Sequence, residues 1–281
     1  MSLLNTPHKF FNTSDGIRLA YRDYGSGKPL LCLSGLTRNS SDFTFLADAL
    51  DTSSNRLICL DYRGRGASDR APSLTYNVPT EARDSLELLD HLNIETAPIL
   101  GTSRGGLIAM TIAALAKDRL TGICLNDIGP EIAAQGIAAI NTYLGRPPPF
   151  KTYAEAAEIR ATLPGFANVP PERWLADVHN LFDHDANGLT LNYDPALRGN
   201  FDATNGQPLP DLWPLFDAME GLPIALIRGA NSNILSAQTT DKMRTRRPDM
   251  IYASVPDRGH VPFLDEPDAL NVINTFLKAI P

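Results

Sequence analysis

Short apolar runs alternate with amphipathic stretches along most of the chain. Runs such as PLLCLSG at residues 29–35 and RLICLDY at residues 56–62 are mostly apolar and end in polar or glycine residues, which is typical of buried strands. Apolar residues that recur three and four positions apart predict helices between them. The predicted strands are residues 9–13, 17–24, 30–33, 56–60, 98–102, 122–126, 223–228 and 250–255. The predicted helices are residues 43–50, 78–92, 105–116, 237–246 and 267–280.

The order of these elements predicts an α/β fold. From residue 30 onward, helices separate the predicted strands, and strands that are apolar throughout need cover on both faces. We therefore expect a mostly parallel, doubly wound sheet of eight strands with helices on both sides. The first two strands, which no helix separates, are expected to form a hairpin at one edge of the sheet.

The sheet is expected to be interrupted by an insertion. Residues 128–222 are rich in alanine, proline and aromatic residues and contain no convincing strand. A structureless loop of that length is uncommon in a compact domain, so this stretch must have structure of its own. We therefore predict a helical lid at residues 129–220, inserted into a core domain made of residues 1–128 and 221–281.

The composition is that of an ordinary globular protein, with 43% hydrophobic and 20% charged residues among 281. The net charge of -7 and the isoelectric point near 5.2 argue against nucleic acid or an anionic membrane surface as a partner, because both would repel the average surface. The N-terminal segment lacks the features of a signal peptide, and no apolar run is long enough to span a membrane. We expect a cytoplasmic monomer or homodimer that acts on a small molecule.

The cysteines give no sign of a disulfide framework or a metal site. Cys32, Cys59 and Cys124 all lie inside predicted buried strands. This position favours reduced thiols that pack as small hydrophobic residues. We therefore expect neither a bound metal nor redox chemistry.

Candidate chemistry begins at GTSRGG, residues 101–106. Gly101, Ser103 and Gly105 form a G-x-S-x-G pattern between a predicted strand and a predicted helix. Glycines on both sides allow a sharp strand-to-helix turn, which would expose the serine at the carboxyl edge of the sheet. The bare pattern also arises by chance, but its position in a parallel sheet favours Ser103 as a nucleophile.

A nucleophilic serine needs a base, and the chain has five histidines. Four of them lie near an edge of the sheet, at a helix end or in the predicted insertion. His260 follows the last predicted strand, so it lies at the same edge as Ser103 and comes after it in the chain. We therefore predict that His260 is the base.

Four motifs in order resemble the α/β-hydrolase fold superfamily over nearly the whole chain. GTSRGG resembles its nucleophile elbow, DYRGRGASD the loop after its fourth strand, DRGHVPFLDEP its histidine loop and LNDIGPEI the entrance to its cap. The resemblance implies a Ser-His-acid hydrolase that works through an acyl-enzyme without a cofactor. It also implies an oxyanion hole made by the main-chain N–H groups of Leu36 and Arg104, with Gly35 beside the substrate. The family's usual His-Gly in that loop is Ser34-Gly35 here, which keeps the main-chain donor.

The third member of the triad stays open. By the resemblance an acid follows the seventh strand, but RGANSN places Asn233 there. A neutral amide can accept a hydrogen bond from the imidazole and hold its tautomer, although it supplies no charge. Asp127, after the sixth strand, is a second candidate because some haloalkane dehalogenases place the acid there; it could also simply brace a turn. Three interpretations remain: Asp127 as the acid, Asn233 as a neutral orienting residue, or an impaired site.

The insertion carries the aromatic residues expected of a lid. Most would form its own small core, while some, with Trp174 and Trp213 as candidates, would face the serine and line an apolar pocket. We therefore expect a carboxylesterase-like enzyme that acts on a small to medium, largely apolar ester, lactone or related carbonyl compound. The alternatives are a C–C bond or enol-lactone hydrolase on the same scaffold, and a catalytically weakened receptor for small molecules.

Overall fold

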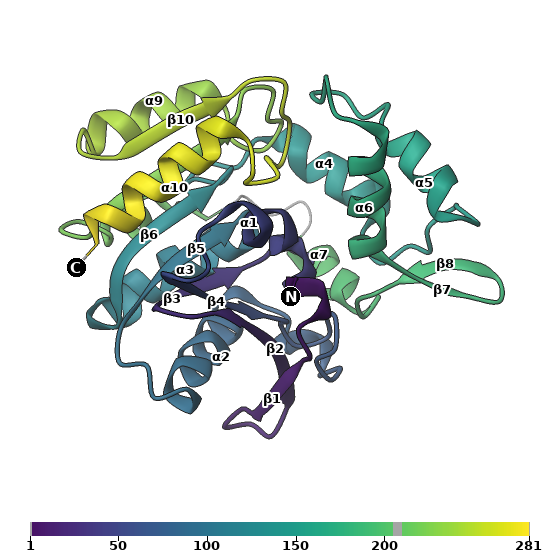
Figure 1. The fold of residues 1–281 in the computed structure, drawn as a ribbon, viewed down its shortest axis with the longest axis horizontal. Coiled ribbons are helices and arrows are strands. Elements are labelled where there is room, and N and C mark those ends of the chain that lie inside the picture. Colours follow the sequence, from purple (N-terminus) through teal and green to yellow (C-terminus); the bar gives the residue numbers. More distant parts are fainter. Residues whose placement is uncertain (1, 205–209, 281) are drawn as a thin grey trace.

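The structure is a computed structural model that describes residues 2–204 and 210–280 (Figure 1). Its strands are β1 (Lys9–Asn12), β2 (Arg18–Gly25), β3 (Lys28–Leu33), β4 (Asn55–Leu60), β5 (Ala97–Thr102), β6 (Leu120–Asn126), β7 (Phe182–Asp185), β8 (Gly188–Leu191), β9 (Ile224–Gly229) and β10 (Ile251–Val255). Its helices are α1 (Thr44–Ala49), α2 (Val78–His91), α3 (Arg104–Leu115), α4 (Ala134–Tyr143), α5 (Tyr153–Arg160), α6 (Pro171–Leu181), α7 (Leu197–Thr204), α8 (Trp213–Asp217), α9 (Ala237–Arg246) and α10 (Pro267–Ala279).

The central sheet has eight strands in the order β1-β2-β4-β3-β5-β6-β9-β10. β1 pairs with β2 and β2 with β4 in antiparallel fashion, and every other pair in this sheet is parallel. The predicted eight-stranded, mostly parallel sheet with an edge hairpin is therefore confirmed. The carboxyl ends of β3, β5, β6, β9 and β10 meet at one edge of the sheet, so the loops that follow them are neighbours.

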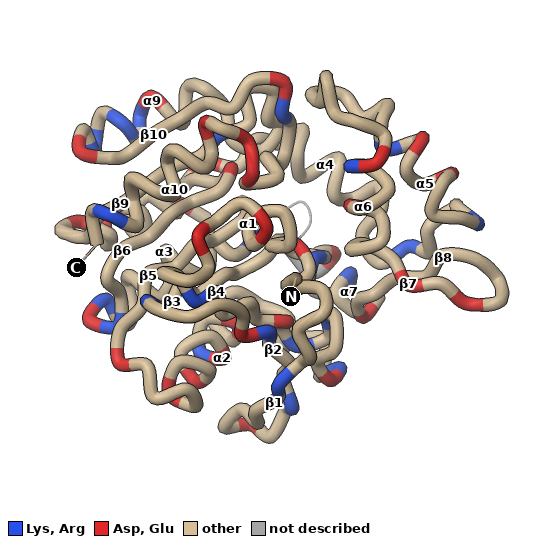
Figure 2. The backbone as a smooth tube through the Cα atoms, in the orientation of Figure 1, with Lys and Arg blue, Asp and Glu red and all other residues tan. Residues whose placement is uncertain are grey.

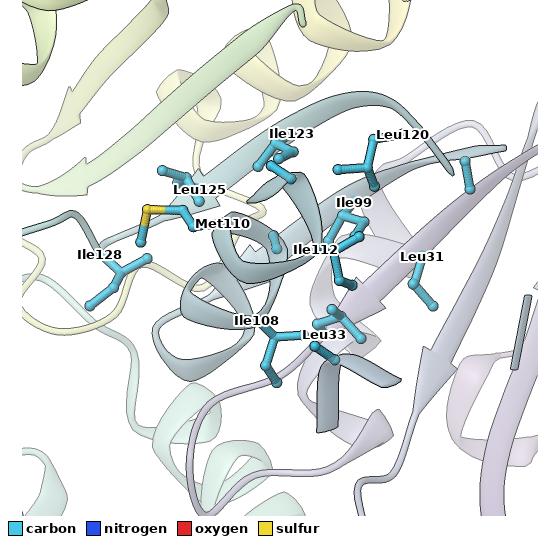
Figure 3. Packing of buried hydrophobic residues seen from close by; sticks show 14 of the residues in the cluster. Leu31, Leu33, Ile99, Ile108, Met110, Ile112, Leu120, Ile123, Leu125 and Ile128 are labelled. Atoms are coloured by element: carbon cyan, nitrogen blue, oxygen red, sulfur yellow. The ribbon is translucent and has the colours of Figure 1, made fainter. Parts of the chain in front are cut away.

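Both faces of the sheet are covered by hydrophobic packing, which explains why its strands are continuous apolar runs. In β3, Leu31 and Leu33 pack on one face, in a core cluster with residues of α2, α3 and α9. Figure 3 shows this packing around α3, with Ile108 and Ile112 among side chains from β3, β5 and β6. Residues of α1 and α10 form the cluster on the other face.

The three cysteines all belong to the cluster formed with α1 and α10, and all are buried and free. Cys32 and Cys59 are register partners on the adjacent strands β3 and β4. Each occupies the alternate position of its strand that faces this cluster, as a small apolar side chain would. The expectation of reduced, packed thiols therefore agrees with their positions.

The segment predicted as the insertion, residues 129–220, lies beside the carboxyl edge of the sheet and contains α4 to α8 (Figure 1). It also contains a two-stranded antiparallel sheet of β7 and β8, so the expectation that it has no strand is wrong. These strands are short, and the two-residue turn Ala186-Asn187 joins them, with Asn187 N–H donating to the Asp185 carboxylate at 2.7 Å. A hairpin with little buried apolar surface leaves a weak pattern in the sequence.

Main-chain hydrogen bonds tie the insertion to the core at several places, including one from Ala133 N–H to the Ile234 carbonyl at 2.9 Å. Gly66 N–H donates to the Asn192 carbonyl at 3.0 Å, and Asp194 N–H donates to the Gly64 carbonyl at 2.7 Å. On the other side, Ala167 N–H donates to the Asp257 carbonyl at 3.2 Å, close to the loop after β10. These bonds hold the insertion against the loops at the carboxyl edge of the sheet.

Charges of both signs are interspersed over the helices and loops (Figure 2). Among the helices in the described ranges, none is long and apolar enough to cross a membrane.

Candidate active site

Ser103 occupies a strained turn between β5 and α3. Its φ of 52° and ψ of -112° lie outside the regions that a serine usually adopts, and its N–H donates to the Asn126 carbonyl at 2.9 Å. The flanking glycines are required by space. A Cβ on Gly101 would lie 2.6 Å from the backbone of Gly105, and a Cβ on Gly105 would lie 2.0 Å from the Leu33 carbonyl oxygen.

We expect Gly105→Ala to lower the free energy of unfolding by about 3 kcal/mol, because the added methyl group meets main chain that cannot move aside. Gly199→Ala is the matched control, since a Cβ there meets only the Ser73 Cβ at 4.0 Å and alanine favours helix α7. Chemical denaturation of both variants measures the difference. Equal stabilities for the two variants would show that the turn does not need its glycine.

His260 connects Ser103 to Asp127. Its Nε2 lies 2.9 Å from Ser103 Oγ, and its Nδ1 lies 2.7 Å from Asp127 Oδ2. His260 stands in the loop between β10 and α10, and Glu266 braces this loop by accepting the main-chain N–H groups of Phe263 and Leu264 at 3.0 Å. The structure therefore brings together the serine and the histidine that the sequence predicts.

Asp127, directly after β6, is fully buried, and both of its carboxylate oxygens have hydrogen-bond partners. Its Oδ1 accepts the Gly229 N–H at 2.8 Å, while its Oδ2 accepts the Ser232 hydroxyl at 2.6 Å as well as contacting His260. With two donors beside the imidazole, this carboxylate is held in one orientation. It can accept the Nδ1 proton and so leave Nε2 free to accept a proton from Ser103.

The structure contradicts Asn233 as the residue that orients His260, because it places Asp127 at the imidazole instead. Asn233 is exposed, and within the described ranges no hydrogen bond joins its side chain to His260. The physical reason is the turn after β9. There the hydroxyl of Ser232 accepts the N–H groups of Ile234 and Leu235 at 3.2 and 3.1 Å and donates to Asp127. Ser232 is thus a site residue that the sequence did not reveal.

The two proposed oxyanion donors lie on either side of Ser103. Arg104 follows it at the N-terminus of α3, and a Cβ on Gly35, next to Leu36, would lie 4.0 Å from the Ser103 Cβ. In the part of the chain that the structure describes, the main-chain N–H groups of Leu36 and Arg104 donate to no protein acceptor. Free N–H groups at a helix N-terminus and in an adjacent loop are the donors that an oxyanion needs.

The loop after β3 is braced without the histidine that is usual in this position. The Ser34 carbonyl accepts the Gly105 N–H at 3.1 Å and the Tyr62 hydroxyl at 3.0 Å. Burial, and then the nearby Glu81 carboxylate, raise the pKa of Tyr62 well above its usual value. The phenol therefore stays protonated and remains a donor to this loop.

The two tryptophans proposed to face the serine have different positions. Trp174 is 2% exposed and packs against Phe166 of the insertion and Phe263 of the histidine loop, and it does not line the cavity that Trp213 lines. Trp213 is half-buried and lines a cavity of about 610 Å³. Leu107, one helical turn after Ser103, lines the same cavity. Whether Trp213 contacts a substrate stays a prediction.

Among residues 2–204 and 210–280, no cluster of three or more histidine, cysteine, aspartate or glutamate side chains is arranged to hold a metal ion.

Known proteins resemble this chain over almost its full length. A family model described as alpha/beta hydrolase fold matches residues 28–267. A 3-hydroxybutyrate-oligomer hydrolase from Cupriavidus necator is 34% identical in an alignment of 272 positions that covers 92% of each chain. A 2-(acetamidomethylene)succinate hydrolase from Mesorhizobium japonicum is 27% identical over 268 residues, 94% of this chain and 92% of the relative. The crystal structure of an alpha/beta hydrolase from Novosphingobium aromaticivorans is 36% identical, has a TM-score of 0.89 and covers 99% of both chains.

Proposed function

The chain belongs to the α/β-hydrolase fold family, and from this premise we propose that it is a serine hydrolase that cleaves carboxylic esters through an acyl-enzyme. The observation that carries the proposal is the hydrogen-bonded series Ser103–His260–Asp127, with contacts of 2.9 and 2.7 Å. Nucleophile, base and orienting acid within hydrogen-bond reach of one another are the arrangement that activates a serine hydroxyl.

The proposed reaction proceeds in two halves. Ser103 Oγ attacks the ester carbonyl carbon while its proton moves to His260 Nε2, and the carbonyl oxygen becomes an oxyanion held by the N–H groups of Leu36 and Arg104. The intermediate then collapses, the C–O bond of the ester breaks, and His260 gives its proton to the departing alcohol. A water molecule, deprotonated by His260, attacks the acyl-enzyme in the same way and releases the acid and free Ser103.

As substrate class we propose short oligoesters of aliphatic hydroxy acids. The support is the 34% identity, over 92% of each chain, to the hydrolase of 3-hydroxybutyrate oligomers. Such oligomers are small aliphatic esters, which agrees with the apolar pocket expected under the insertion. We further propose that the insertion acts as a lid that excludes water and polymeric substrates.

A receptor without catalytic activity is disfavoured. That alternative depended on the absence of an acid after β9, and the Asp127 carboxylate now stands at the imidazole instead. The second alternative, hydrolysis of a C–C bond or an enol-lactone, needs the same nucleophile, and cleavage of an enol-lactone in preference to the oligomers would favour it.

The test is a substrate panel with the Ser103→Ala variant as the blank. It compares p-nitrophenyl esters of increasing acyl length, soluble dimers to tetramers of 3-hydroxybutyrate, the insoluble polymer and an enol-lactone, with products identified by mass spectrometry. We expect monomer release from the soluble oligomers and none from the polymer. Cleavage of p-nitrophenyl esters without cleavage of oligomers would refute the substrate class, and no ester cleavage at all would refute the function.

A further inference from the structure

Glu81 joins two arginines from different parts of the fold. It lies in the first turn of α2 and is fully buried. Its Oε1 is 2.9 Å from Nη1 of Arg65, which lies in the loop after β4, and its Oε2 accepts Nε of Arg104, the first residue of α3, at 2.5 Å. None of these side-chain contacts has a part in the proton transfer described above.

Arg65 connects Glu81 to the loop after β3. Its Nε donates to the Leu36 carbonyl at 3.1 Å, and its Nη1 donates to the Arg63 carbonyl at 2.7 Å. A bond to the Leu36 carbonyl restrains the backbone of the residue whose N–H is one of the two proposed oxyanion donors. Arg65 is almost completely buried and packs against the rings of Tyr62 and Tyr76 at 5.6 and 5.4 Å, so its guanidinium has little freedom to move.

Arg104 connects Glu81 to the second proposed oxyanion donor, which is the main-chain N–H of Arg104 itself. Its side chain contacts Glu81 and the Tyr76 carbonyl, to which Nη2 donates at 3.0 Å, and it does not occupy the position of the oxyanion. The side chain therefore anchors the first residue of α3, whose own main-chain N–H is left free. One carboxylate thus holds, from both sides, the two residues that flank the position of the developing oxyanion.

The three side chains also carry an excess of positive charge. Two guanidinium groups face one carboxylate, in a buried region where charges are weakly screened. Burial lowers the pKa of Arg65 and the Glu81 carboxylate acts in the opposite direction, and a guanidinium keeps its proton under such conditions. The excess charge favours a negative oxygen close to Leu36 and Arg104.

We propose that Glu81 is a positioning residue of the oxyanion hole: through Arg65 and Arg104 it fixes the two main-chain donors, Leu36 N–H and Arg104 N–H, at the spacing that the oxyanion requires. The inference rests on the proposed function. A positioning role for Glu81 can be distinguished from a purely structural role of the buried ion pairs by its effect on kinetics. A positioning residue affects binding of the transition state much more than binding of the substrate.

The experiment compares Glu81→Gln with Glu87→Gln, a matched carboxylate on the same helix that bonds to Ser14 and Arg83 away from the site. We expect Glu81→Gln to lower kcat by about 10- to 100-fold, less than the loss of an oxyanion donor itself. KM should stay within about twofold, because ground-state binding does not use the oxyanion donors. The affinity for a trifluoromethyl ketone, whose serine adduct carries an oxyanion, should fall by the same factor as kcat/KM. Glu87→Gln should match the wild type in all three measurements.

A second variant keeps the inference testable if Glu81→Gln does not fold. Arg104→Met removes one arm of the link at a side chain that is partly exposed and leaves the main-chain donor in place. It should reproduce the fall in kcat and in ketone affinity, and the double variant should lose little more than the larger single one, because both act through the same link.

Several outcomes are decisive. If the wild type turns over esters and Glu81→Gln does so at the same rate, this inference is overturned while the proposed function stands. The same holds if Glu81→Gln has a lower kcat but binds the ketone as tightly as the wild type. If Glu81→Gln does not fold, an Arg104→Met enzyme with wild-type kcat would overturn it in the same way. A wild-type protein without ester turnover would overturn the proposed function and this inference with it.

Discussion

Ser103→Ala should reduce kcat for ester hydrolysis by roughly a million-fold, to the level of the oxyanion hole and binding alone. The physical reason is that the 2.9 Å contact to His260 Nε2 then has no hydroxyl to activate. The melting temperature should stay the same or rise, because the strained turn at Ser103 serves chemistry at the expense of stability. Initial rates on p-nitrophenyl butyrate and a thermal melt measure both effects.

Ser54→Ala is the matched control for this substitution. Ser54 precedes β4, so it lies at the amino end of the parallel strands, at the opposite edge of the sheet from the site. Ser54 is exposed, and its hydroxyl donates to the Asp51 carboxylate at 2.7 Å, within the same turn. Its rate should equal that of the wild type. A Ser103→Ala enzyme that keeps a tenth or more of the wild-type rate would show that another group is the nucleophile.

Asp127→Asn should lower kcat by roughly 10⁴-fold, which is the loss expected when the acid of a triad becomes an amide. An asparagine amide can donate to Nδ1, which stabilises the wrong tautomer and leaves Nε2 protonated, and it supplies no charge to the imidazolium. Gly229 N–H and Ser232 would still hold the side chain in place, so the fold should survive. The measurement is kcat at saturating ester together with a circular dichroism melt.

Asn233 provides the comparison for Asp127. Because it is exposed and does not bond to His260, Asn233→Ala should change kcat by less than about twofold, within the range of surface substitutions. Asn233→Asp should not raise the rate, since the carboxylate at Nδ1 is already present. A large loss in Asn233→Ala with little loss in Asp127→Asn would reverse the assignment of the third member.

The strands of the sheet could be predicted to within two residues, because strands that are buried on both faces appear in the sequence as continuous apolar runs. In β5, every residue from Ala97 to Thr102 is buried, and its apolar residues mark the strand in the sequence. The β7–β8 hairpin was missed for the opposite reason. Three of the four residues of β7 are exposed, so no apolar run marks it.

The partner of His260 could not be decided from the sequence, because it depends on how two neighbouring strand ends meet. β6 and β9 are adjacent in the sheet, so Asp127 after β6 and the turn after β9 both lie near the histidine loop. What decides between them is Ser232, whose hydroxyl closes the turn and binds Asp127, leaving Asn233 exposed. A serine in a polar turn carries no sign of this role in the sequence.

The positions of Trp174 and Glu81 also could not be predicted from the sequence, because they depend on packing between distant segments. Nothing in the spacing of aromatic residues tells which of them fills the interior of the insertion, and only its packing places Trp174 there. Glu81 in the sequence is an ordinary first-turn acid of a helix. Its contacts with Arg65 and Arg104 arise because α2, α3 and the loop after β4 converge beside the serine.

The most direct test of the nucleophile is the site of covalent labelling. Wild-type protein is treated with a fluorophosphonate, digested and mapped by peptide mass spectrometry, with Ser103→Ala and Ser54→Ala treated in parallel. Because Ser103 Oγ lies against the base, we predict a single adduct per chain on the peptide that contains Ser103, unchanged in Ser54→Ala and absent from Ser103→Ala. An adduct on another residue, or an active enzyme that is never labelled at Ser103, would contradict the assignment.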